Sequence, residues 1–74
     1  MKPQCFDIIK YKGKPHIILE FDHLNKNAKI SVWYHSLDST SLMDNMDMII
    51  LADKLKPSDT VSIKELNKCK IERR

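Results

Sequence analysis

Glycine and cysteine are both scarce in this 74-residue chain. Gly13 is the one glycine, so the sequence excludes a glycine-rich phosphate loop and leaves Asn, Asp and Pro to form most turns. The two cysteines, Cys5 and Cys69, form no C-x-x-C pair, and the three histidines have no recognised metal-ligand spacing. The sequence therefore predicts no metal site and no cofactor.

Long apolar runs are absent as well. The longest, 48–52, is too short to cross a bilayer, and the first residues lack the apolar run of a signal peptide. We therefore expect a cytoplasmic protein with no membrane partner and with free thiols. The alternative is a disulfide between Cys5 and Cys69 that bridges the terminal strands.

Groups that could carry out catalysis are also lacking. Neither Cys5 nor Cys69 has an evident activating neighbour, and no serine lies in a strained turn. A chain of this length also has little depth from which to exclude water. The sequence therefore predicts a protein that is not an enzyme, with no catalytic residue.

The composition is that of a folded globular chain. Hydrophobic residues make up 42% and charged residues 31% of the sequence. A domain of this size buries only about 60% of the surface of its unfolded chain. We expect one small domain over residues 1–74, with room for a single core and a shallow groove.

Three segments in the first half have strand patterns. Residues 4–12 and 15–22 are separated by a turn at Gly13, and 28–36 follows a polar loop rich in Asn. Alternation is clear in 15–22, whereas Ile9 interrupts it in 4–12 and leaves the inward face ambiguous. These segments predict an antiparallel meander.

The second half allows competing interpretations. Residues 37–47 favour a loop or short helical turn before a buried strand at 48–52, although a helix capped near Ser39 or Ser41 is the alternative. The tail favours a short strand, one helical turn at 65–67 and a closing strand. The alternative is a single helix that starts at Ser58 or Asp59.

Five short strands, with the run Val-Ser-Ile-Lys-Glu-Leu-Asn-Lys-Cys-Lys-Ile giving one turn before the closing strand, resemble SH3-like or Tudor-like small β-barrels. The ALYDY-type run of SH3 domains and the glycine-rich repeat of KOW-type barrels are absent, so the resemblance implies only a fold. We expect a mostly β protein, a small five-stranded antiparallel barrel or bent sheet with at most one short helical turn. The expected core comprises Phe6, Ile8, Ile17, Leu19, Phe21, Ile30, Val32, Tyr34, Met48, Ile50, Ile63, Leu66 and Ile71.

The segment 28–36 contains the strongest candidate binding surface. Period-two alternation places Ile30, Val32 and Tyr34 on one face, and the other face carries an indole, an imidazole and an ammonium group. An exposed Trp flanked by such groups is typical of interfaces. The alternatives are that Trp33 packs under residues 36–47 or the tail, and that the methionines are core filler. The predicted partner-binding residues are Lys29, Ser31, Trp33, His35, Met43 and Met46.

Charge is segregated along the chain. Residues 1–37 carry +3, residues 38–53 carry −4 with no base, and residues 54–74 carry +4. This pattern favours a protein-interaction module, a regulator or inhibitor of the sort that phages and other mobile elements encode, that docks on a larger protein. It is expected to be a monomer or an edge-strand homodimer. The alternative is a nucleic-acid-binding barrel that binds RNA or DNA through Lys10, Lys12, Lys29, Trp33, Lys68, Lys70 and Arg73.

Overall fold

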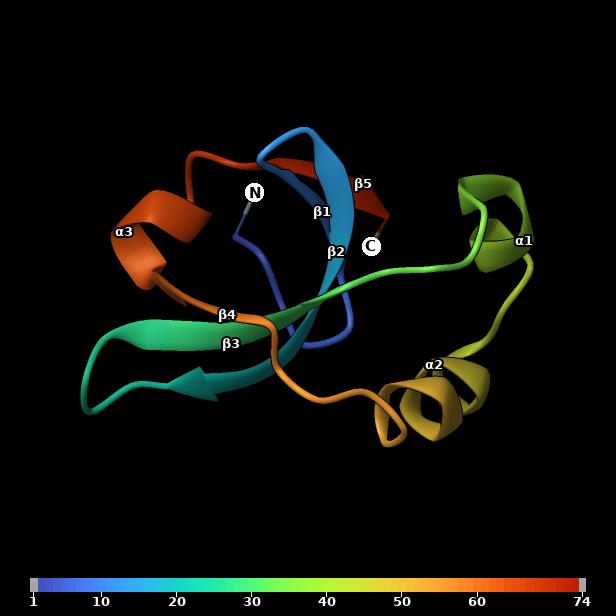
Figure 1. Cartoon of the computed structure of the whole chain (residues 1–74), viewed down its shortest axis with the longest axis horizontal. Coiled ribbons are helices and arrows are strands. Elements are labelled where there is room, and N and C mark those ends of the chain that lie inside the picture. Colours follow the sequence, from blue (N-terminus) through green and yellow to red (C-terminus); the bar gives the residue numbers. More distant parts are fainter. Residues whose placement is uncertain (1, 74) are drawn as a thin grey trace.

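The computed structural model describes residues 2–73, which form one antiparallel sheet of five strands and three short helices (Figure 1). The order along the sheet is β4-β3-β2-β1-β5. Because β4 and β5 are opposite edges, the sheet is open and not a closed barrel, while the mostly β prediction is confirmed. The elements are β1 (Ile8–Tyr11), β2 (Lys14–Asp22), β3 (Asn27–Val32), α1 (Leu37–Ser41), α2 (Asn45–Ala52), β4 (Asp59–Ser62), α3 (Ile63–Leu66) and β5 (Lys70–Arg73).

The β1–β2 hairpin forms at the predicted turn. Tyr11 pairs with Lys14, which leaves Lys12 and Gly13 as a two-residue loop. Both have positive φ, 52° and 79°, as a turn that matches the twist of the two strands requires. In the next hairpin the residue with positive φ is Lys26, at 56°, although Asn25 and Asn27 beside it tolerate this conformation better.

Both faces of the sheet are buried, which explains the interrupted alternation in the first strand. Ile8 and Ile9 are adjacent and fully buried, as are Ile17 and Ile18, and the two members of each pair belong to different clusters. We call Ile9, Ile18, Ala28, Ile30, Val61 and Leu66 the inner cluster. We call Ile8, Ile17, Trp33, Met48 and Ala52 the outer cluster.

Helices α1 and α2 form an insert between β3 and β4, named here the helical insert (residues 37–52). In Figure 1 it lies on one side of the sheet and α3 on the other. Its Met48 and Ala52 belong to the outer cluster. The predicted strand at 48–52 is therefore wrong, as is the limit of one helical turn. The prediction failed because the apolar residues of α2 lie on all its sides and form no single stripe. One side packs on the sheet, while the other is exposed to solvent.

Each helix begins at a side-chain cap. Ser36 accepts a hydrogen bond from the backbone N–H of Ser39, Asp44 from that of Asp47, and Ser62 from that of Glu65. The cap at Ser36 lies before the predicted positions. The tail forms the predicted strand, helical turn and strand, so the single-helix alternative is wrong.

The predicted core is wrong at two positions, one just after β3 and one on α2. Tyr34 is 77% exposed and Ile50 is 50% exposed, because the chain leaves the sheet after β3 and because Ile50 lies on the outward side of α2. Ile8, Ile17, Ile30, Met48 and Leu66 are buried as predicted. The remaining predicted members are partly buried, namely Phe6, Leu19, Phe21, Val32, Ile63 and Ile71.

Candidate functional site

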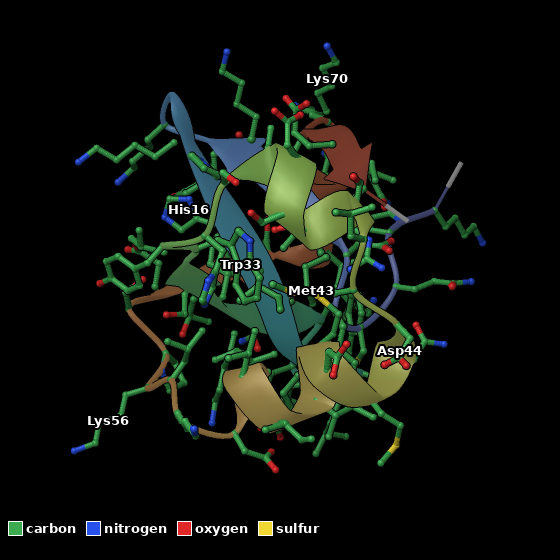
Figure 2. The ribbon with its side chains drawn as sticks, turned by 90° about the vertical axis from the view of Figure 1, so that its right-hand side faces the viewer. His16, Trp33, Met43, Asp44, Lys56 and Lys70 are labelled. Atoms are coloured by element: carbon green, nitrogen blue, oxygen red, sulfur yellow. The ribbon has the colours of Figure 1, made fainter. Side chains whose placement is uncertain are left out.

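Trp33 fastens the helical insert to the sheet. Its backbone N–H donates to the carbonyl of Pro15 at 2.9 Å, so pairing with β2 continues past the end of β3. Its indole N–H donates to Oγ1 of the fully buried Thr40 at 2.6 Å, and the Thr40 hydroxyl donates to the Ser36 carbonyl at 2.9 Å. Figure 2 shows Trp33 beside the insert. The indole is therefore both a core group and an anchor for α1.

The predicted exposed surface on residues 29–35 is wrong. Trp33 is 3% exposed and Ser31 is also buried, whereas Lys29 and His35 are exposed. The His35 ring lies over one side of the indole, with centroids 4.8 Å apart. The segment runs extended as expected, but the insert that follows it covers this face. The alternative prediction, in which Trp33 packs under residues 36–47, is confirmed.

The insert itself presents an apolar face to solvent. Met46 is 64% exposed, and Ile50, one turn further along α2, is 50% exposed. Met43 instead packs against the outer cluster, so only one of the two predicted methionines lies at the surface. The sequence pattern did not indicate Ile50 as a surface residue, because 48–52 was predicted to be a buried strand.

Two carboxylates lie at the N-terminal end of the helix that carries this apolar pair. Asp44 caps α2 and Asp47 lies in its first turn, beside Met46 in the chain. The segment 38–53 contains four Asp and no Lys or Arg. We call Met46 and Ile50, with the carboxylates of Asp44 and Asp47, the acidic helical face. Its character favours a partner surface that offers basic groups around an apolar cleft.

A second surface has the opposite charge. Lysines from β1, the β1–β2 turn and the start of β5 line a groove of about 390 Å³, which also includes Tyr11, Glu65 and Cys69. We call this surface the basic groove. Figure 2 shows Lys70 at the end of the molecule opposite Lys56. The lysines of the basic groove are Lys10, Lys12, Lys68 and Lys70.

The other residues predicted for nucleic-acid binding lie elsewhere. Lys29 is on β3, opposite Glu20 on β2 and Thr60 on β4, and Trp33 is buried. Arg73 is partly buried and its guanidinium donates to the Met43 carbonyl, so it joins β5 to the insert. The predicted set is therefore divided, with four lysines together and three residues outside the groove.

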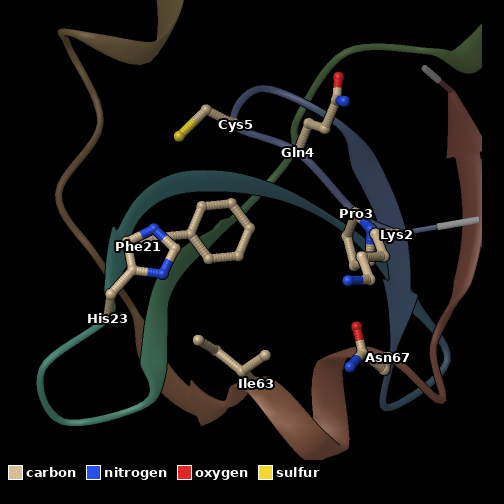
Figure 3. A pocket seen from close by; sticks show the side chains of 8 residues that line it. All are labelled: Lys2, Pro3, Gln4, Cys5, Phe21, His23, Ile63 and Asn67. Atoms are coloured by element: carbon tan, nitrogen blue, oxygen red, sulfur yellow. The ribbon is translucent and has the colours of Figure 1, made fainter.

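A pocket of about 450 Å³ opens beside the chain start (Figure 3). Phe21 and His23 stack with ring centroids 5.8 Å apart, and Ile63 adds a further apolar side chain. Sequence analysis missed this pocket because its residues come from three segments that are distant in the chain. They are Lys2, Pro3, Gln4, Cys5, Phe21, His23, Ile63 and Asn67.

The thiols of Cys5 and Cys69 are both free. Partial burial raises the pKa of the Cys5 thiol; the nearby carboxylates of Glu20 and Asp7 raise it further, while a backbone hydrogen bond at Phe21 opposes them. Burial also raises the pKa of Cys69, with Glu65 adding to the effect. A raised pKa reduces the thiolate fraction, which is the nucleophilic form.

Within residues 2–73, no three His, Cys, Asp or Glu side chains are grouped so that they could hold a metal ion. In the same range, no helix has both the length and the apolar character needed to span a membrane. Comparison of the chain with protein-family models, with curated proteins and with solved structures finds no match.

Proposed function

We propose that this protein is a non-enzymatic interaction module of the cytoplasm, a small regulator or inhibitor of the kind encoded by mobile elements, that docks on a larger protein through the acidic helical face. The observation that carries the proposal is the pair of exposed apolar side chains, Met46 and Ile50, in a segment with four carboxylates and no base. A helix with anchors at i and i+4 is a common element of groove recognition.

The energetics support this surface. Complete burial of a fully exposed Met or Ile side chain gains about 1.5–3 kcal/mol, and Met46 and Ile50 still expose half or more of theirs. Met also adapts its shape to irregular partner surfaces. Met48 and Ala52 pack α2 against the sheet, so part of the ordering cost has been met before the partner arrives.

The fold proposal is a relationship to SH3-like small barrels. Its support is five antiparallel strands in one sheet and the single turn of α3 before β5. In this proposal the helical insert is an addition between β3 and β4. Because such folds serve many unrelated functions, the relationship leaves the choice of partner to the insert.

The deciding experiment is affinity capture from a lysate of the cells that express the chain, after nuclease treatment. We expect wild-type protein to retain one larger protein with a basic binding surface. The variant Met46→Ser/Ile50→Ser should bind it at least about tenfold more weakly, since a lost apolar anchor at an interface costs more than about 1 kcal/mol.

The matched control is Leu24→Ser, which removes an apolar side chain that is 91% exposed at the β2–β3 loop, outside the insert. It should bind like the wild type. Equal capture by all three proteins would refute docking through α2. Capture of a second copy of this chain in place of a larger protein would point to a homodimer paired at β4 or β5 and would also overturn the proposal.

A further inference from the structure

We propose that the basic groove binds the phosphate backbone of single-stranded nucleic acid, at a site separate from the acidic helical face. Four lysines line one concave surface of about 390 Å³, and Glu65 is the one acid among its lining residues. Phosphate groups are the ligands whose repeated negative charge such a surface matches.

The tertiary structure creates this concentration of charge from distant segments. Lys10 on β1 and Lys70 on β5 are directly opposite each other in the antiparallel register. Lys12 follows β1 into the turn, and Lys68 lies in the turn between α3 and β5, two residues before the strand begins. Lysines separated by some sixty residues of chain therefore face one groove.

The opposed pair Lys10 and Lys70 favours a ligand over simple solvation. Like charges directly opposite on neighbouring strands are destabilising. The free protein bears this repulsion on β1 and β5, reduced by the carboxylate of Glu72, which lines an adjoining pocket with Lys10. A bound anion between the two ammonium groups would remove the rest. The acidic segment 38–53 does not contribute to the groove lining, so its carboxylates do not neutralise these lysines there.

Tyr11 favours a single strand over a duplex. Tyr11 lines the groove and is packed in part against the inner cluster, with Lys12 Nζ over its ring, 5.3 Å from the centroid. An aromatic side chain in a basic groove is the arrangement on which unpaired bases stack. The His16 ring meets Tyr11 edge-on, with centroids 5.4 Å apart, and so supports the position of the tyrosine ring.

The test is fluorescence anisotropy with labelled oligo(U) and oligo(dT) from about 50 to 200 mM salt. Four phosphate contacts predict a slope of log K against log salt near −3, because each contact to a single strand contributes about −0.7. The variant Lys10→Gln/Lys70→Gln should lose about half of this slope and bind about tenfold more weakly at the low-salt end. RNA and DNA should behave alike, since both present the same phosphates.

The control Lys54→Gln/Lys56→Gln removes the same charge outside the groove lining. It should keep the wild-type slope. Thermal melts should show both variants folded, with Lys10→Gln/Lys70→Gln at least as stable as wild type. Equal weakening by both variants would mean that net charge alone attracts the oligonucleotide.

Two further arms decide the class of ligand. A poly-Glu peptide or anionic lipid vesicles bound as tightly as oligo(U) would overturn the assignment to nucleic acid. A duplex bound as tightly as the single strand would overturn the role of Tyr11. Loss of binding by Met46→Ser/Ile50→Ser would place the contact on the acidic helical face, so failure here is distinguishable from failure of the protein-docking proposal.

Discussion

The two faces of the sheet are covered in different ways. The inner cluster is built from the strands and the short helix α3, which the local sequence pattern predicts. The outer cluster depends on the helical insert, which contributes Met48 and Ala52 and is fastened by Trp33. The first kind of core follows from alternation in the strands. The second kind requires a segment with no simple amphipathic stripe to fold back onto residues distant in the chain.

This difference explains why the sequence predicted an exposed Trp33 and a buried Tyr34, whereas the structure has the reverse. Trp33 and Tyr34 are adjacent, and alternation alone cannot say which of two neighbours faces a covered side. The insert covers the side that carries Trp33, so Tyr34 is the residue left in solvent.

The largest expected effect is loss of the indole that holds the insert. Trp33→Ala should lower the free energy of unfolding by about 3–5 kcal/mol, because it leaves a cavity in the outer cluster. The matched control Tyr34→Ala, an exposed neighbour, should change it by no more than about 0.5 kcal/mol. Urea unfolding followed by circular dichroism measures both values. Equal effects would show that the outer face is not sealed by Trp33.

A second pair of variants compares the faces directly. Ile17 and Ile18 are neighbours of the same type, fully buried in the outer and inner clusters respectively. Ile17→Ala and Ile18→Ala should each cost about 2–5 kcal/mol, since both cores are packed. The same urea titration tests them. A cost below about 1 kcal/mol for Ile17→Ala alone would mean that the insert covers its face loosely.

The buried hydrogen bond of the insert should have a smaller effect. Thr40→Val keeps the side-chain shape but leaves the Trp33 indole N–H without its acceptor, which should cost about 1–3 kcal/mol. Thr60→Val, at an exposed position on β4, is the control and should change stability by about 0.5 kcal/mol or less. A neutral Thr40→Val would show that packing alone fixes the insert.

Loss of the N-terminal cap of α2 should lower the free energy of unfolding by a smaller amount. Asp44→Ala removes the side chain that accepts from the Asp47 N–H and should cost about 0.5–2 kcal/mol. Asp53→Ala removes the same charge at the opposite end of the helix, where a negative group is unfavourable. It should be neutral or slightly stabilising. Urea unfolding followed by circular dichroism measures both variants. Equal destabilisation by both would argue against a role for the cap.

The smallest effect lies outside both clusters, at the β2–β3 hairpin. Hydrogen bonds from the Asn25 side chain and backbone lower the pKa of the Asp22 carboxyl below its usual 3.8. The associated stability is present above that value and is lost as pH falls through the lower folded pKa. Asn25→Ala should therefore lose less stability than wild type between about pH 6 and about pH 2. Identical pH profiles would show that the contact has no effect on folding.

Local chemistry accounts for the parts of the fold that the sequence predicted. The turn at Gly13, the three strands of the meander and the helical turn before β5 depend on neighbouring residues and on period-two alternation. Helix α1 lies within 37–47, where a loop or short helical turn was predicted, whereas α2 replaces the predicted strand at 48–52. The reason is that the cap at Asp44 resembles loop chemistry and that the apolar residues of α2 form no single stripe.

The sequence by itself determined a small, mostly β chain whose basic ends flank an acidic middle, because composition and alternation are properties of the chain alone. Only the tertiary structure decided that Trp33 is buried, that Met46 and Ile50 are exposed, and that lysines from both ends of the chain share one groove. The physical reason is that a strand pattern defines two faces without saying what covers either. The register of β1 against β5 and the return of the helical insert onto the sheet supply that information.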